Sequence, residues 1–215
     1  MAEKAFNLGT KELRQSAILG NKTNTRRIIK TKVPIQDGWR LMTCVDGMNE
    51  KHRGMHIFAS DEVIHKYGVN RTEYFNSKYQ VGDIMWLQEP YQIDEVDLDT
   101  HRAYGTYSED KRFFDVPLGC DHFKLWWKRK YRHRKTAGRF MYRSLARHFF
   151  KVTGVGIERV QDISEADAEA EGVIVQNIGE TWWRAFKRVW DSCYGVGAWD
   201  RNDHVFKYTF EKIER

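Results

Sequence analysis

A basic turn with two kinds of reactive side chain lies between Gly20 and Arg27. It contains Lys22, Thr25 and the adjacent guanidinium groups of Arg26 and Arg27. Cationic side chains in such a turn can hold a phosphate or polarise a carbonyl group. The two arginines also disfavour the ammonium form of Lys22, so its neutral amine can act as a base toward a threonine hydroxyl. The same residues also fit a plain solvated basic loop, and composition leaves both interpretations open.

A second candidate is a carboxylate at the end of a short predicted helix. Ser164 begins this helix, and Glu165 and Asp167 lie near its start, where acidic side chains match the helix dipole. Glu169 and Glu171 fall near its end, where they oppose the dipole. This position makes a carboxyl group easier to protonate, so Glu171 is a candidate for proton transfer. A solvated acidic helix is the alternative interpretation.

The third candidate is a basic segment, residues 124–151, which holds eleven Lys and Arg residues and no Asp or Glu. Aromatic side chains lie among these cations, and phosphate contacts combined with stacking are typical of single-stranded nucleic-acid binding. The alternative is a basic surface loop that Trp126 and Trp127 anchor to the core. We expect the contacts with RNA or DNA to come from Lys128, Arg129, Lys130, Arg132, Arg139 and Arg143.

The overall charge conceals this uneven distribution. The 215 residues contain 36 Lys and Arg against 30 Asp and Glu, a net charge of +6. Outside residues 124–151, 25 basic residues remain against the same 30 acidic ones, a balance of −5. With 41% hydrophobic and 14% aromatic residues, the chain is expected to fold into a core. No apolar run approaches the roughly 20 residues of a membrane span, so we expect a cytoplasmic protein without a membrane partner.

Metal and cofactor chemistry has little support in the sequence. Cys44, Cys120 and Cys193 are odd in number and widely spaced, which argues against a disulfide framework or a cysteine-rich zinc site. The nearby histidines match no zinc spacing, and the chain has no P-loop, G-x-G-x-x-G or G-x-S-x-G motif. We therefore expect no metal and no cofactor. The sequence leaves the oligomeric state open.

The elements that must position these residues form a mixed α+β pattern. In the first half, residues 6–9 are predicted to form a short strand, and Thr10 caps a helix over residues 11–19. A second short helix is predicted from Ser60 to Gly68. The apolar run 83–89 predicts a buried strand.

The second half has clearer patterns. Residues 150–160 predict a strand, with a bulge at its glycines. Ser164 and Gly172 bracket the short acidic helix, and residues 182–193 have the spacing of an amphipathic helix. The alternation over residues 206–211 predicts a final strand with one buried face. No periodicity of this kind marks residues 33–80 or 91–137, which we expect to be insertions.

Five segments occur together in the order found in one family of proteins. They cover about half of the chain, and as a set they resemble the ASCH family of the PUA-like superfamily, in the longer form common among phage and prophage proteins. The segments are ILGNKTNTRRII (18–29), GDIMWLQE (82–89), GRFMYRSLAR (138–147), VTGVGIERVQDISEADAEAEGV (152–173) and WDSCYGVGAWDRNDHVFKYTFE (190–211).

The resemblance implies an α+β fold, with a small mixed β-barrel flanked by helices and extended by insertions. It implies one domain over residues 1–215 and a cleft that faces RNA or a nucleobase derivative. Within the wider family, the small bacterial N4-acetylcytidine amidohydrolases carry a G-x-K-x-x-T motif, which Gly20, Lys22 and Thr25 match. By this similarity Lys22 would deprotonate Thr25 for attack on the acyl carbonyl, and Glu171 would transfer a proton to the leaving amine.

The combined expectation is an enzyme, a hydrolase that acts on an acylated cytidine-type base with Lys22, Thr25 and Glu171 as catalytic residues. Two alternatives stay open: a non-catalytic RNA- or DNA-binding module, and a ribonuclease that uses the same basic cleft. The expected partner in each case is RNA or a modified nucleoside or nucleic acid. Additional binding residues are expected at Arg26, Arg27, Trp86 and Glu89.

Overall fold

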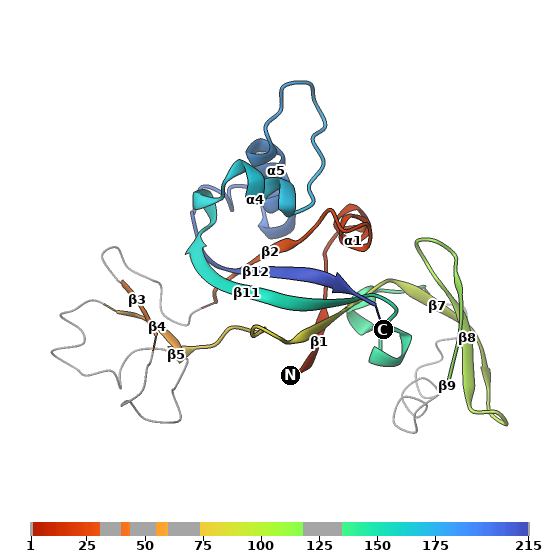
Figure 1. The fold of residues 1–215 in the computed structure, drawn as a ribbon. Coiled ribbons are helices and arrows are strands. Elements are labelled where there is room, and N and C mark those ends of the chain that lie inside the picture. Colours follow the sequence, from red (N-terminus) through yellow and green to blue (C-terminus); the bar gives the residue numbers. More distant parts are fainter. Residues whose placement is uncertain (1, 31–39, 44–54, 60–73, 118–134, 215) are drawn as a thin grey trace.

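The computed structural model describes residues 2–30, 40–43, 55–59, 74–117 and 135–214. In these residues the chain forms three β-sheets and three α-helices, together with three short 3-10 turns (Figure 1). The α+β class predicted from the sequence is therefore confirmed. Within the described residues, no helix is long and apolar enough to cross a membrane.

A curved five-stranded sheet forms the centre of the molecule. Its strands follow the order β1-β6-β11-β12-β2, with β1 and β6 parallel and every other neighbouring pair antiparallel. The described strands show no pairing between β2 and β1, so the small β-barrel that the sequence led us to expect is not closed. The strands are β1 (Glu3–Phe6), β2 (Asn24–Ile28), β6 (Ile84–Leu87), β11 (Phe149–Arg159) and β12 (His204–Ile213).

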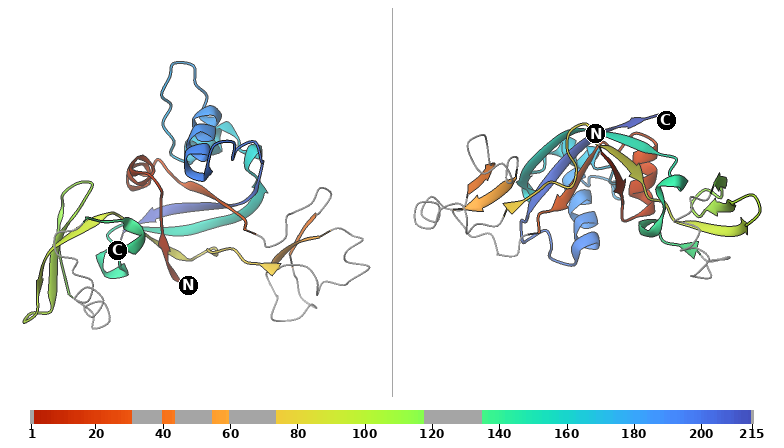
Figure 2. Two further views of the ribbon diagram at one scale, coloured as in Figure 1. Left: turned by 180° about the vertical axis from the view of Figure 1, so that it is seen from behind. Right: turned by 90° about the horizontal axis from the view of Figure 1, so that it is seen from below.

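Two smaller sheets extend from opposite ends of the central sheet, as both views in Figures 1 and 2 show. One has the order β3-β4-β5 and the other the order β10-β7-β8-β9. Both come from the segments expected to be insertions. The strands are β3 (Arg40–Thr43), β4 (His56–Ala59), β5 (Tyr74–Phe75), β7 (Tyr91–Asp97), β8 (Arg102–Tyr107), β9 (Phe113–Pro117) and β10 (Lys135–Thr136).

The helices begin and end where their capping residues predict. The Thr10 hydroxyl accepts a hydrogen bond from Leu13 N at the start of α1, and the Ser164 hydroxyl accepts one from Asp167 N at the start of α4. Gly172, just beyond α4, has a φ of 71°. The helices are α1 (Lys11–Ile18), α4 (Glu165–Ala170) and α5 (Trp182–Tyr194), and the 3-10 turns are Gly138–Phe140, Arg143–Leu145 and Val160–Asp162.

Alternation along the central strands sends successive side chains to two different cores. On β12, Phe206, Tyr208 and Phe210 face a core with α1, whereas Val205 faces a core with α4 and α5. On β6, Trp86 belongs to a third core, shared with the β7–β9 sheet. Strand β2 thus lies between the core with α1 and the core with α4 and α5, and its polar side chains lie at the boundaries of these two cores.

Most of the elements predicted within the described residues are confirmed, and one differs. The strand expected at residues 6–9 lies earlier, at Glu3–Phe6, because the chain pairs there with β6 in parallel register. The bulge predicted in β11 occurs between Val152 and Gly154. The helix predicted from Ser60 to Gly68 lies outside the described residues.

Candidate functional site

Lys22 and Glu171 are in direct contact where the turn before β2 meets the end of α4. Lys22 Nζ lies 2.6 Å from Glu171 Oε2, and it donates further 2.7 Å hydrogen bonds to the carbonyl oxygens of Glu171 and Asn24. Lys22 is 2% exposed and Glu171 is 4% exposed. Since an ammonium group has three N–H donors, these three acceptors use all of them.

The electrostatic environment of Lys22 disfavours its charged form. Burial lowers the pKa of the Lys22 ammonium most, and the positive charges of Arg27 and Arg26 lower it as well. The charge and hydrogen bond of Glu171 act in the opposite direction, but the net pKa remains below its ordinary value. Lys22 is therefore a lysine that can give up a proton more easily than one in water.

A glycine allows the end of α4 to come this close to Lys22. A Cβ atom placed on Gly172 would lie 2.3 Å from Ser16 Oγ and 2.7 Å from Lys22 Cβ. Both distances are too short for atoms that are not bonded to each other. The positive φ of Gly172 also suits glycine. A hydrogen bond from Thr23 N to Ala170 O fixes the turn against the helix from the other side.

Arg26 connects Glu171 to a larger buried ion network. Its side chain is fully buried, and its guanidinium group contacts Glu171 Oε1 at 3.1 Å, Glu158 Oε1 at 2.6 Å and Asp167 Oδ2 at 3.2 Å. Lys207 Nζ lies 2.5 Å from the same oxygen of Asp167. The network thus joins β2, β11, β12 and α4. Arg26, expected as a substrate-binding residue, is placed among these carboxylates inside the protein.

Thr25 and Arg27 lie on the opposite face of β2. Their cross-strand partners are Tyr208 and Phe206, and directly opposed residues share a face. Thr25 is 1% exposed, and its hydroxyl makes no hydrogen bond with Lys22 in this state. The structure therefore joins Lys22 to Glu171, and places Thr25 three residues further along on the same turn and strand.

A cavity of about 360 Å³, the Arg27 cavity, opens on this face, and its wall includes Arg27 and Tyr208, the cross-strand neighbour of Thr25, but not Thr25 itself. Arg27 donates a 2.6 Å hydrogen bond from Nη2 to the carbonyl oxygen of Asn7, another lining residue. The Tyr79 and Tyr208 rings meet edge to face, with centroids 5.1 Å apart. Its lining consists of Asn7, Arg27, Ile28, Ile29, Lys30, Asn76, Lys78, Tyr79, Phe206 and Tyr208.

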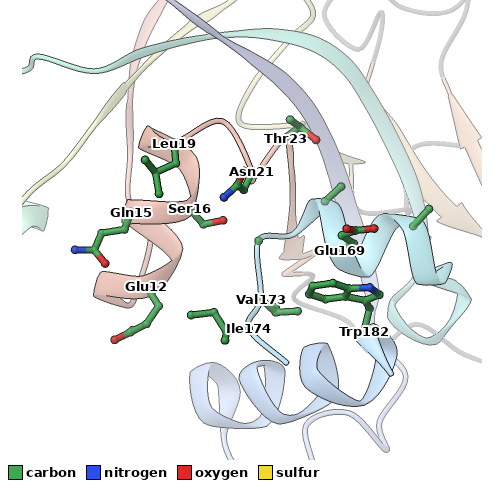
Figure 3. Close-up of a pocket in the computed structure, with 13 residues that line it drawn as sticks. Glu12, Gln15, Ser16, Leu19, Asn21, Thr23, Glu169, Val173, Ile174 and Trp182 are labelled. Carbon is green, nitrogen blue, oxygen red and sulfur yellow. The ribbon is translucent and has the colours of Figure 1, made fainter. Parts of the chain in front are cut away.

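A larger pocket, of about 620 Å³, lies between α1, the end of α4 and α5 (Figure 3). Its lining includes two carboxylates, on Glu12 and Glu169, but neither Lys22 nor Glu171. Trp182 and Leu19, the residue that follows α1, supply apolar surface on different sides of it. The pocket therefore adjoins the Lys22–Glu171 pair, since the sequence neighbours of both residues line it (Asn21, Thr23, Ala170 and Gly172), but the two side chains themselves are not part of its lining.

Two further predicted binding residues, Trp86 and Glu89, are buried near the β7–β9 sheet. Trp86 packs in the core of that sheet. Glu89 is 1% exposed and accepts two hydrogen bonds from Arg147, at 2.7 and 3.0 Å. Arg147 also contacts Asp110 at 2.8 Å and lies over the Tyr107 ring. The structure places both residues away from Lys22, in contacts that hold this sheet to the central one.

The basic segment 124–151 is only partly described. Lys128, Arg129, Lys130 and Arg132 lie outside the described residues. Arg139 is exposed above the Phe140 ring, and Arg143 forms a 2.7 Å pair with Glu3. Together with the Glu89 contact of Arg147, this shows that acidic residues far away in the sequence neutralise part of the segment. A count of charges along the chain therefore overstates its free positive charge.

Sequence reasoning missed several residues of the Arg27 cavity. Asn7, Lys30, Lys78 and Tyr79 belong to separate parts of the chain, and none of them stands in a motif. Phe206 and Tyr208 carried a signal, because the alternation along residues 206–211 placed them on a buried face, and Arg27 was expected from the basic turn. Within the described residues, no group of three His, Cys, Asp or Glu side chains could hold a metal ion.

Comparison with known proteins gives one structural likeness. No family model and no curated protein matches the chain. Among solved structures, the chain is similar to the high-resolution crystal structure of an ASCH domain from Lactobacillus crispatus JV V101. The TM-score is 0.39 at 11% sequence identity, over 100% of this chain and 81% of that chain.

Proposed function

We propose that this protein is a hydrolase directed at a nucleoside or nucleic acid, and that it removes an acyl group from the exocyclic amine of a cytidine-type base. One observation carries the proposal: a buried lysine of lowered pKa contacts the carboxylate of Glu171 and is followed, three residues later, by Thr25. A base, a proton carrier and a hydroxyl nucleophile are the groups that acyl transfer requires. The PUA-like architecture that the sequence resembles is part of the same proposal.

The reaction begins at the contact between Lys22 Nζ and Glu171 Oε2, 2.6 Å apart. Transfer of one ammonium proton to Glu171 Oε2 leaves Lys22 as a neutral amine. This amine accepts the hydroxyl proton of Thr25 as Thr25 Oγ1 attacks the acyl carbonyl. The carbon–nitrogen bond then breaks, Glu171 donates its proton to the leaving amine, and the acyl group remains as an ester on Thr25. Water hydrolyses this ester and restores the free hydroxyl.

The contacts of this state define the movement that the reaction needs. Lys22 Nζ must turn from Asn24 O toward Thr25, because all three of its donors are engaged. Arg26 keeps hold of Glu171 Oε1 during this movement. We place the base in the Arg27 cavity, because its wall includes Tyr208, the cross-strand neighbour of Thr25, and its volume of about 360 Å³ is within the usual range of small-molecule sites.

The test uses the purified full chain with N4-acetylcytidine and, separately, with single-stranded RNA. Wild type is compared with Lys22→Met and with Lys4→Met, which disrupts a 2.5 Å pair between Lys4 on β1 and Asp83 just before β6. We expect acetate release by wild type and Lys4→Met, and a loss of roughly 100-fold or more in Lys22→Met. Wild-type turnover in a folded Lys22→Met variant would contradict the proposal.

The same experiment distinguishes the alternatives. Cleavage of the RNA by wild type, lost in Lys22→Met, identifies a ribonuclease. RNA that is bound intact, equally by wild type and Lys22→Met, identifies a binding module, and its affinity should then weaken steeply with salt. Either result, without acetate release, would replace the proposed amidohydrolase activity.

A further inference from the structure

Three cations from different parts of the chain line the Arg27 cavity. Arg27 comes from β2, Lys30 follows β2, and Lys78 precedes β6. Among the described residues, no carboxylate lies within ion-pair distance of any of them. Elsewhere the buried cations are paired: Lys22 contacts Glu171, and Arg14 contacts Glu109. The excess of positive charge is therefore a local property of this cavity.

Backbone carbonyl groups hold two of these cations in place without neutralising them. Arg27 donates from Nη2 to Asn7 O at 2.6 Å and from Nη1 to Arg26 O at 3.3 Å. Lys78 Nζ donates to Ala5 O at 3.1 Å. A guanidinium group has five N–H donors and an ammonium group has three, so donors remain on both side chains. These cations are oriented, charged and still able to bind an anion.

The arrangement is unfavourable until an anion joins it. Burial lowers the pKa of Lys78, and the positive charge of Arg27 lowers it further. Like charges gathered at a half-buried cavity repel one another, and a bound anion removes that repulsion. Phosphate oxygens fit such donors well, since arginine and lysine are the usual phosphate-binding side chains.

We propose that Arg27, Lys30 and Lys78 form a phosphate subsite, so that the preferred ligand is a nucleotide or a nucleic-acid strand rather than a free nucleoside. The inference rests on the proposed function for the identity of the base, and on the cavity for the phosphate. Tyr79, Tyr208 and Phe206 supply an apolar floor on which sugar and base can rest. Thr25, opposite Tyr208, lies next to that floor.

Calorimetric binding to the full chain tests the subsite, with cytidine, cytidine 5′-monophosphate and a short single-stranded oligocytidine as probes. The informative variant is Lys78→Gln, and the matched control is Lys212→Gln. Lys212 is also exposed and also donates one hydrogen bond to a backbone carbonyl, Ile18 O at 2.8 Å, but it does not line the cavity. The circular dichroism spectrum of each variant confirms that it is folded.

We expect wild type to bind the monophosphate at least roughly tenfold more tightly than cytidine, the value of one charge-assisted hydrogen bond. Lys78→Gln should lose most of that preference, and Lys212→Gln should keep it. If the oligonucleotide alone shows the preference, the phosphate belongs to a strand. Equal affinity for cytidine and both phosphorylated probes, or an unchanged preference in Lys78→Gln, would overturn the subsite.

Activity and binding fail independently in this design. A protein that binds the monophosphate tightly but releases no acetate from acetylated cytidine or its 5′-phosphate retains the subsite and loses the proposed reaction. A protein that hydrolyses the free nucleoside and the nucleotide with equal kcat/KM retains the reaction and loses the subsite.

Discussion

Replacing Glu171 by glutamine tests how strongly the buried pair with Lys22 is coupled to folding. The substitution keeps the shape of the side chain but removes the charge that faces Lys22 Nζ at 2.6 Å and Arg26 Nη1 at 3.1 Å. Removing one partner of a buried ion pair costs roughly 3–5 kcal/mol, because the remaining charge is left without compensation.

We expect the lower end of that range, about 3 kcal/mol, for two structural reasons. Lys22 keeps two carbonyl acceptors, Asn24 O and the main-chain oxygen of residue 171. Its pKa also falls further once Glu171 no longer raises it, so that the lysine can become neutral. For a chain of this length, about 3 kcal/mol corresponds to a decrease in Tm of roughly 6–12 °C.

Thermal unfolding followed by circular dichroism measures this shift, and Glu169→Gln is the control. Glu169 is an exposed acid two residues earlier, at the end of the same helix, and its variant should change the unfolding free energy by less than about 0.5 kcal/mol. Combining Glu171→Gln with Lys22→Met should cost less than the sum of the two single changes. A Tm of Glu171→Gln equal to that of Glu169→Gln would refute the coupling.

Two further predictions concern the glycine beside Lys22 and the half-buried His148. Gly172→Ala should lower the free energy of unfolding, measured in urea, by at least about 2 kcal/mol, because the added Cβ would collide with Ser16 and Lys22 and the φ of residue 172 is positive. Gly156→Ala is the control, because a Cβ there meets no atom within 4 Å. Equal effects of the two substitutions would contradict the packing argument. Burial lowers the pKa of His148 below 6.5, as do the charges of Arg147 and Lys212, against the opposing effect of Glu89 and Asp110. The unfolded chain therefore binds the proton first, and stability falls as pH decreases from 6.5 through the folded-state pKa. His148→Gln should reduce this slope, and an unchanged slope would show that other groups cause it.

Local signals in the sequence were sufficient to predict the helices on either side of the site. Thr10 and Ser164 are capping residues whose hydrogen bonds reach only three positions along the chain, so their effect can be predicted without knowledge of the fold. The alternation of β12 is equally local. The contact of Lys22 with Glu171 spans 149 positions, and it was expected only through the resemblance to a family.

Long-range contacts explain what the sequence did not reveal. Arg26 looked like a surface cation because its partners Glu158 and Asp167 arrive from β11 and α4. Strand β8 alternates, but its buried positions include Ala103 and Gly105, which give no hydrophobic signal. A Cβ on Gly105 would lie 2.2 Å from Gln92 O, so β7 and β8 approach each other there too closely for any side chain.

Thr25 provides the most direct test of the proposed reaction, since its hydroxyl oxygen forms the new bond to the acyl carbon. Thr25→Val preserves the shape of the side chain, and Thr25→Ser preserves the hydroxyl. The measurement is the rate of acetate release from N4-acetylcytidine and its 5′-phosphate by the three proteins. We predict that the valine variant loses roughly 100-fold or more and that the serine variant keeps a measurable part of the activity. Release of acetate by Thr25→Val at the wild-type rate would contradict the account.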